Sequence, residues 1–407
     1  MDQARKVCIL IIHGIGQQGR YDTLDLFTRN LVKSLQDKLQ HPLRLAHHHL
    51  RVGEEADDYV SLGYDHHGPT QVDIHEYYWA HDMERIVSFR ETIEWLIQAS
   101  DGAQKFYDEN EQFAAQFEPF ENGRFKKRWY LKHIGWVLRL FYTLGLVSSR
   151  FMPGFLDPLF RLFMGKATQL VVDYLGDVAI YTSSDVKSKF YQVRQLVLGG
   201  AQKKIKLLLE RDYEKVIVVG HSLGSVIAYD ALNQLNLQMN EDAELAQHKS
   251  KLSELITLGS PLDKVAFFFR EHIPDEEYVK KLIIAHINGF RRKDVLIPST
   301  AFEPPSPLDP ELSSSVRSFL RHMRWTNYWD ERDPISGRLD FYNGVLNVKV
   351  DNERRWGYAH IGYWENMQIY REALERTLAP QCQVPEEQTG QEPFEPDDCY
   401  LIGDFTP

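Results

Sequence analysis

The stretch Lys215-Val-Ile-Val-Val-Gly-His-Ser-Leu-Gly-Ser-Val-Ile-Ala-Tyr229 predicts a strand, a sharp turn and a helix. Val216 to Val219 form an uninterrupted β-branched run, which is typical of a strand buried on both faces of a parallel sheet. The turn from Gly220 to Gly224 has the pattern Gly-x-Ser-x-Gly, and apolar residues at helical spacing follow it. The stretch therefore predicts an α/β fold with the hydroxyl of Ser222 projecting above a mostly parallel sheet.

A serine in such a turn is placed for nucleophilic chemistry. Gly220 and Gly224 remove side chains that would collide where the strand and the helix pass closely. The helix also points its N-terminal N–H groups toward the turn, where they can meet a developing negative charge. The alternative is a small-residue turn that contains a serine by chance, and the flanking strand and helix favour the catalytic interpretation.

Composition limits the class of protein. The chain has 407 residues, of which 43% are hydrophobic and 12% aromatic, which is enough to form a large hydrophobic core. The net charge is −11, and residues 380–407 contribute seven acidic residues and no Lys or Arg, so little in the balance suggests a nucleic-acid binder. Cys8, Cys382 and Cys399 give no disulfide framework, and no signal-peptide pattern opens the sequence. These features predict a cytoplasmic protein.

A second functional loop is expected near the N-terminus. The apolar strand Val7–Ile12 runs into His13-Gly-Ile-Gly-Gln-Gln18, and a helix pattern follows from Leu24 to Leu39. A phosphate-binding loop is a poor interpretation, because the Gly-x-Gly-x-x-Gly spacing and a P-loop lysine are missing. Small residues would instead let backbone N–H groups approach a substrate oxygen, which predicts an oxyanion loop.

Histidines are concentrated between residues 43 and 80. His47, His48, His49, His66 and His67 invite a metal interpretation, but no cysteine accompanies them. The acids Asp57, Asp58 and Asp65 lie in what reads as a solvated loop, so a surface loop is preferred to a metal site. Val72 to Trp79 predicts a partly exposed strand or one near a sheet edge.

Residues 81–180 interrupt the strand–helix rhythm with a helical, aromatic-rich pattern. Within it, residues 124–164 combine basic and aromatic side chains, and Ile134 to Val147 is too short an apolar run to span a bilayer. We expect an inserted helical cap that packs on the core. Peripheral contact with a membrane through residues 124–164 is the alternative, and the two are compatible.

The rest of the chain returns to alternating elements. The domain organisation expected is a core from residues 1–80 and 181–379, an insertion at 81–180 and an acidic, disordered tail at 380–407. The predicted elements are a helix over Asp185–Arg211, continuous or broken at Gly199-Gly200; a strand and turn over Glu254–Pro261 beside the Ser222 strand; a strand or buried helix end over Leu282–Ile287; strands Arg324–Trp329 and Val345–Val350; and a closing helix over Ile361–Leu378.

A serine nucleophile needs a base within hydrogen-bond reach and a third group that orients the base. In a fold of this kind the order along the chain is serine, acid, histidine. His360 follows the last predicted strand and precedes the last helix, so it is the expected base. Asp333, set in a turn by Pro334, is the expected acid. Asp330 is its nearest rival, and Asp294 would serve if Leu282–Ile287 were the relevant strand.

Together these motifs resemble the serine α/β-hydrolase superfamily in its lipase/esterase branch. The resemblance rests on His13-Gly14, the elbow Gly220–Gly224, the stretch Leu258-Gly-Ser-Pro-Leu262 and the positions of Asp333 and His360. Two departures stand out: the strands that usually precede the oxyanion loop are absent, and residues 81–180 match no pattern. His221, inside the elbow, is expected to face away from the serine and to be structural.

The resemblance implies hydrolysis of carboxylic esters, including lipid-like acyl esters, through an acyl-enzyme intermediate. Ser222 would attack the ester carbonyl, His360 would accept its proton, and Asp333 would hold the imidazole. The N–H of Leu223, with that of Ile15 or Gly14, would stabilise the oxyanion, and no metal or organic cofactor is required.

Two other functions fit the same residues. The first is acyl transfer to an alcohol or amine. The second is a catalytically inactive hydrolase fold that binds a membrane surface or a protein partner. The substrate, a small-molecule or lipid-like ester, depends on residues 81–180.

Overall fold

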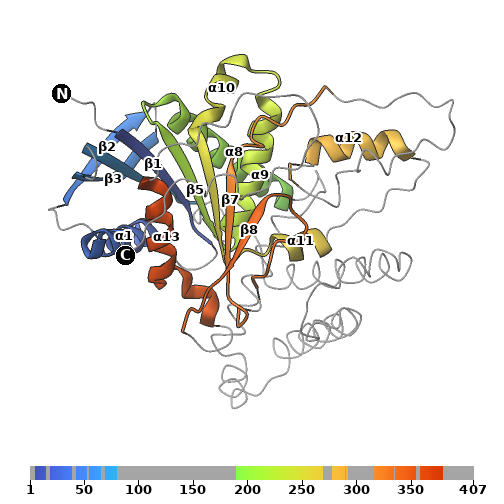
Figure 1. Ribbon diagram of the computed structural model, residues 1–407. Coiled ribbons are helices and arrows are strands. Elements are labelled where there is room, and N and C mark those ends of the chain that lie inside the picture. Colours follow the sequence, from blue (N-terminus) through green and yellow to red (C-terminus); the bar gives the residue numbers. More distant parts are fainter. Residues whose placement is uncertain are drawn as a thin grey trace, which may run out of the picture.

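An eight-stranded sheet forms the centre of the protein (Figure 1). The computed structural model describes residues 5–14, 19–38, 43–52, 55–65, 69–79, 189–268, 277–288, 290–291, 315–333, 335–353 and 358–378. The strand order is β2-β3-β4-β1-β5-β6-β7-β8. The strands are β1 (Arg5–Ile12), β2 (Arg44–Val52), β3 (Glu55–Asp65), β4 (Pro69–Tyr77), β5 (Lys215–His221), β6 (Leu252–Leu258), β7 (Arg324–Trp329) and β8 (Val345–Lys349).

The sheet is mixed and mostly parallel. From β4 through β1 to β8 all neighbours pair in parallel, whereas β2, β3 and β4 form an antiparallel meander. In the central pair, Ile12 of β1 lies opposite Gly220 of β5. Because parallel strands end at the same edge of a sheet, the loop after β1 and the turn after β5 are neighbours.

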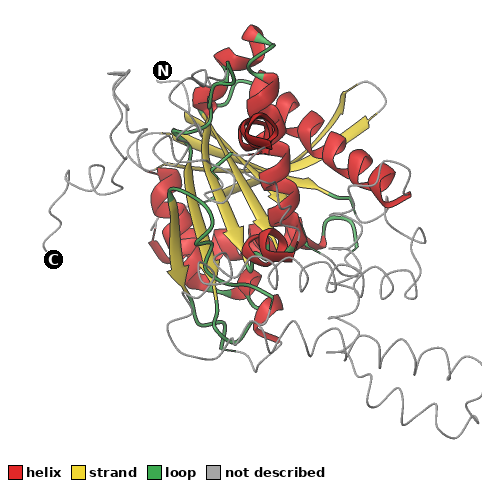
Figure 2. Ribbon diagram, turned by 90° about the vertical axis from the view of Figure 1, so that its right-hand side faces the viewer, coloured by secondary structure: helices red, strands yellow, loops and turns green. Residues whose placement is uncertain are grey.

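Helices cover both faces of the sheet (Figures 1 and 2). Helices α1 (Asp22–Lys38) and α13 (Met367–Leu378) pack on one face, and α8 (Lys189–Glu210) and α9 (Leu223–Gln238) pack on the other. The remaining helices with labels in Figure 1 are α10 (Ala243–Gln247), α11 (Leu262–Phe268) and α12 (Tyr278–Asn288).

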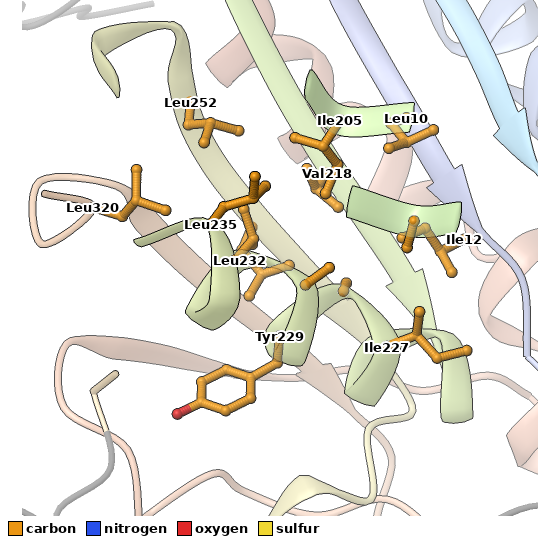
Figure 3. Close-up of a cluster of buried hydrophobic side chains, with 14 of the residues drawn as sticks. Leu10, Ile12, Ile205, Val218, Ile227, Tyr229, Leu232, Leu235, Leu252 and Leu320 are labelled. Atoms are coloured by element: carbon orange, nitrogen blue, oxygen red, sulfur yellow. The ribbon is translucent and has the colours of Figure 1, made fainter. Parts of the chain in front are cut away.

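Strand β5 shows why an uninterrupted apolar run is needed here. Alternate side chains of a strand point to opposite faces. Val216 and Val218 therefore join the core under α8 and α9, and Ile217 and Val219 join the core under α1 and α13. Figure 3 shows Val218 in the first of these cores, near Ile205 of α8 and the α9 leucines. Burial on both faces thus holds the strand that carries Ser222.

Most predicted elements of the core are confirmed, with corrections at the ends. Helix α8 is continuous through Gly199-Gly200. The segment Leu282–Ile287 is part of helix α12 and not a strand, so it offers no strand end to Asp294. The closing helix begins at Met367 because two 3-10 turns, Tyr358–Ile361 and Tyr363–Glu365, precede it.

The interpretation of His47, His48 and His49 and of the acids Asp57, Asp58 and Asp65 as parts of a polar loop was wrong, and His66 and His67 lie outside the described residues. His47, His48 and His49 lie in β2, and the three acids lie in β3. Polar residues are acceptable in β2 because it is the edge strand of the sheet and is largely exposed. Asp57 is buried, but it forms ion pairs with Lys204 in α8 and with Arg211, which directly follows α8.

Strand β4 was also wrongly assigned to a position near an edge. It lies between β3 and β1, and Val72, Ile74 and His75 are buried. The antiparallel strands β2 and β3 extend the sheet beyond β4.

Several predictions concern segments outside the described residues. These are the insertion at 81–180 with its segment 124–164, the tail 380–407, and Asp294. The domain boundaries placed there stay predictions. Among the helices that the structure does describe, none has the length and apolar character needed to cross a membrane.

Candidate active site

Ser222 lies at the sharp turn between β5 and α9, in a backbone conformation that L-residues rarely adopt. Its φ is 53° and its ψ is −125°, and the residue is buried. Its N–H donates to the carbonyl of Leu258 in the neighbouring strand β6, at 2.9 Å. The surrounding sheet therefore holds a strained conformation of the kind found at functional turns.

Close packing around the turn explains three glycines. A Cβ at Gly220 would lie 2.6 Å from the Cα of Ser225, and one at Gly224 would collide with the carbonyl of Ile12. A Cβ at Gly14 would lie 2.7 Å from the Cβ of Ser222. The loop after β1 therefore touches the serine turn directly, and only hydrogen atoms fit between them.

His360 joins Ser222 to Asp333 through two hydrogen bonds. Its Nε2 is 2.8 Å from Ser222 Oγ, and its Nδ1 is 2.8 Å from Asp333 Oδ2. A carboxylate only accepts, so Nδ1 carries the proton and Nε2 accepts from the serine hydroxyl. All three side chains are buried. The structure thus brings the three sequence-predicted residues together in the order nucleophile, base, acid.

Asp333 is held as a carboxylate. Its Oδ1 accepts the N–H of Ile335 at 2.8 Å. Burial alone would raise the pKa of Asp333, but the facing His360 and the nearby Lys264 together hold it below its usual value. The acid is therefore ionised at neutral pH and can orient an imidazole and stabilise its cation.

Of the two rival acids, Asp330 lies in the described part of the chain and has partners of its own. Asp330 is buried, but its carboxylate accepts hydrogen bonds from the Arg332 side chain and from the backbone N–H of Asn352. It fixes the loop that carries Asp333. Asp294 lies outside the described residues.

His221 is a neighbour of the base loop. Its Nε2–H donates to the backbone carbonyl of His360 at 2.9 Å, and burial lowers its pKa to about 3, so its ring is neutral. His221 therefore has a structural role, because it anchors the backbone of His360, the residue that bonds to Ser222. Its sequence position next to the serine gave no signal of this contact.

The loop after β1 is fixed by a buried histidine. The backbone N–H of Trp79 donates to Nε2 of His13 at 3.3 Å, so Nδ1 carries the ring proton and donates to the Gly14 carbonyl at 2.7 Å. The indole N–H of Trp79 donates to the His13 carbonyl, and the two rings are stacked. Burial lowers the pKa of His13 to about 4, which keeps the ring neutral.

The predicted oxyanion donors divide into described and undescribed residues. Leu223 is the first residue of α9, so its N–H has no acceptor within the helix. Gly14 lies against Ser222, and Ile15 is outside the described residues. The N–H of Leu223 and an N–H of the loop after β1 can therefore both donate to a substrate oxygen bound beside Ser222.

The surroundings of Asp333 include one residue that sequence reasoning missed. The hydroxyl of Tyr363 is 3.0 Å from Asp333 Oδ2. Tyr363 lies three residues after His360, in a segment whose sequence shows no motif around it. No group of three or more His, Cys, Asp or Glu side chains in the described ranges is arranged to hold a metal ion.

Comparison with known families identifies the region around Ser222. A family model described as Lipase (class 3) matches residues 161–272. Over these residues the chain is similar to the class 3 lipases. This family is a branch of the serine α/β-hydrolases, so the resemblance inferred from the sequence is confirmed. Searches of curated proteins and of solved structures found no match.

The class 3 lipase match covers part of the site. Residues 161–272 include β5, the serine turn, α9 and β6, whereas His360 and Asp333 lie beyond them. The family supports a serine hydrolase that acts on lipid esters. The roles of His360 as the base and Asp333 as the acid are inferred from their geometry around Ser222.

Proposed function

We propose that the protein hydrolyses carboxylic esters of lipid-like acyl chains through an acyl-enzyme formed on Ser222. The observation that carries this proposal is the continuous pair of hydrogen bonds from Ser222 through His360 to Asp333, each 2.8 Å long. The class 3 lipase match supports the choice of lipid esters as the substrate class.

In the first half of the reaction, Ser222 Oγ attacks the ester carbonyl carbon while its proton moves to His360 Nε2. The carbonyl oxygen becomes an oxyanion beside the N–H of Leu223 and the loop that contains Gly14. Each donor to that oxygen lowers the barrier by on the order of 3 kcal/mol. Collapse of the intermediate breaks the ester C–O bond, and the leaving alcohol takes the proton from His360.

In the second half, water attacks the acyl-enzyme and gives its proton to His360. The carbon–Oγ bond then breaks, Ser222 regains the proton, and the free acid leaves. Asp333 stays ionised throughout and stabilises the imidazolium in both halves. His360 thus mediates every proton transfer of the two halves.

Ester turnover by a Ser222→Ala variant tests this function. With p-nitrophenyl esters of short and long acyl chains, we expect kcat to fall by at least about a thousandfold. Ser253→Ala is the matched control, because that serine lies in the neighbouring strand β6 and bonds only weakly to the Val216 carbonyl. Equal turnover by Ser222→Ala and the parent protein would contradict the proposal.

Product analysis separates hydrolysis from acyl transfer. In the presence of a competing alcohol, we expect free acid to be the main product. A predominance of the new ester would favour the acyltransferase alternative.

A parent protein that turns over no ester would instead favour a binding module, and co-sedimentation with neutral and anionic vesicles would then examine the membrane contact predicted for residues 124–164.

A further inference from the structure

The hydroxyl of Tyr363 lies at the centre of a buried hydrogen-bond cluster behind the acid. It is 3.0 Å from Asp333 Oδ2, 2.9 Å from the backbone N of Asp330 and 2.9 Å from Ser336 Oγ. The residue is fully buried. A phenol with three partners and no access to water is bound in one orientation.

The direction of each bond follows from the chemistry of the partners. The backbone N–H of Asp330 can only donate, so the Tyr363 oxygen accepts it. The carboxylate of Asp333 can only accept, so the single phenol proton points to it. The second lone pair of the phenol oxygen is then left for Ser336, whose hydroxyl must donate. Burial raises the pKa of Tyr363 well above its usual value, so the proton stays on the phenol.

Two donors meet on one carboxylate oxygen. His360 Nδ1 and the Tyr363 hydroxyl both end on Asp333 Oδ2, at 2.8 and 3.0 Å. Gly259, with φ of 59°, makes room for this arrangement, because a Cβ there would lie 2.7 Å from the Tyr363 ring. The oxygen that faces the base is thus held from a second direction.

We propose that Tyr363 is a positioning residue for the acid–base pair, acting through its hydrogen bond to Asp333. This inference rests on the proposed function of Ser222, His360 and Asp333. No bond to Tyr363 forms or breaks in the reaction. Its phenol keeps the carboxylate aimed at Nδ1 while His360 gains and loses a proton at Nε2, and so ties the base loop to the acid loop.

The first test compares two tyrosine-to-phenylalanine variants. Tyr363→Phe keeps the ring and removes the hydroxyl, and we expect kcat to fall about tenfold or more with KM changed less than about twofold, since one hydrogen bond to a charged group is lost. Tyr370→Phe is the matched control: it is equally buried, but its hydroxyl donates to the Trp364 carbonyl. An unchanged kcat in Tyr363→Phe would overturn the proposal.

A double-mutant cycle separates positioning from a general structural effect. In an Asp333→Asn background the carboxylate is gone, so we expect Tyr363→Phe to cause less than about a twofold further change. The rate at which a fluorophosphonate labels Ser222 serves as the readout when turnover is slow. A full tenfold loss in both backgrounds would show that Tyr363 does not act through Asp333, and would overturn the proposal.

Two outcomes distinguish this inference from the proposed function. If the parent protein is active and Ser222→Ala is not, an unaffected Tyr363→Phe overturns the inference alone. An inactive, unlabelled parent overturns both. If Tyr363→Phe fails to fold, Ser336→Ala removes the donor that directs the phenol proton to Asp333. A smaller fall in kcat, about two- to fivefold, is then expected, and no change would count against the proposal.

Discussion

At the scale of single residues, the site depends on close contact between two turns that are distant in the sequence. The loop after β1 and the turn after β5 meet where Gly14 touches Ser222, and a Cβ at Gly14 would lie 2.7 Å from that of Ser222. The strained φ of Ser222 is held by the backbone bond from its N–H to Leu258 of β6. Small changes in backbone position should therefore affect activity before they affect folding.

Gly14→Ala tests this contact. The added methyl group would lie 2.7 Å from Ser222 Cβ and 2.9 Å from the His221 carbonyl, so one of the turns must move. We expect kcat for ester hydrolysis to fall at least about tenfold, because misplacement by a fraction of an ångström weakens an aligned site. Gly199→Ala in α8, where a Cβ would meet nothing within 4 Å, should leave kcat within about twofold. Equal kcat values for the two variants would argue against the contact.

The residue-level hypothesis could be made from sequence because each side chain follows a recognisable element. Ser222 has its own motif, and His360 and Asp333 were chosen by their order after late predicted strands. Tyr363 and the His221 contact to His360 could not be found in this way. Both depend on how loops far apart in the chain pack together, and no local pattern encodes that.

At the scale of elements, the central strand and helix are the easiest to predict because burial on all sides leaves a strong apolar signal. β5 is buried along its length, and α9 is buried at most positions. The hairpin β2–β3 was missed because its histidines and acids hide the alternation of a strand. Asp57 read as a surface acid, yet it is buried against cations that arrive from α8, nearly 150 positions later in the chain.

The packing of α9 can be measured with a core substitution. Leu232 is fully buried in the cluster shown in Figure 3, among residues of α8 and the sheet. We expect Leu232→Ala to lower the free energy of unfolding by about 2–5 kcal/mol in urea titrations. Leu196→Ala is the control, since that side chain is 64% exposed and should change stability by less than about 0.5 kcal/mol. Similar losses for both would contradict the buried position of α9.

The ion pairs of Asp57 fix the antiparallel extension to α8. Arg211 lies 2.8 Å from Asp57, and Lys204 contacts the other carboxylate oxygen. Asp57→Asn leaves these cations without their charge partner, and we expect a loss of about 2–3 kcal/mol in unfolding free energy. Asp212→Asn removes a much more exposed pair with Lys6, so it should cost under about 1 kcal/mol. Equal costs would mean that the Asp57 pairs do not anchor the hairpin.

At the scale of the whole molecule, buried neutral histidines couple stability to pH. Burial lowers the pKa of His13 to about 4, that of His221 to about 3, and also that of His75. These histidines bind protons near pH 6.5 in the unfolded chain but not in the folded protein, so the stability that they contribute is complete above that pH and falls as the pH drops toward 4. Burial raises the pKa of Glu76 to about 7, which acts in the opposite sense and offsets part of this loss. The loss at pH 5 should be about 2 kcal/mol for His13 and for His221.

Unfolding in urea at pH values from 7 to 5 measures this coupling. We expect the free energy of unfolding to decrease with acidification. The slope of this free energy against pH gives the number of protons taken up on unfolding, and His13→Gln should lower that number by about one. Leu196→Ala, at an exposed position of α8, changes no titratable group and should leave the slope unchanged. A His13→Gln variant whose stability falls as steeply with acidification as that of the parent protein would contradict the buried, neutral state of the His13 ring.

The α/β class of the whole molecule could be predicted because apolar strand runs alternate with helical spacing along the sequence. The mixed topology of the sheet could not be predicted. Local sequence does not tell whether a strand joins its neighbour in parallel or antiparallel, and β2, β3 and β4 form the antiparallel side. The same limit applies to residues 81–180, where helical and aromatic patterns predict a cap without locating it.

Active-site labelling is the decisive measurement for Ser222 as the activated nucleophile of a serine hydrolase. The folded parent protein is treated with a fluorophosphonate, and the adduct is located by peptide mass mapping. We expect a single modified serine, Ser222, with labelling lost in Ser222→Ala and strongly slowed in His360→Ala. An adduct on another residue, or an unlabelled parent protein, would contradict it.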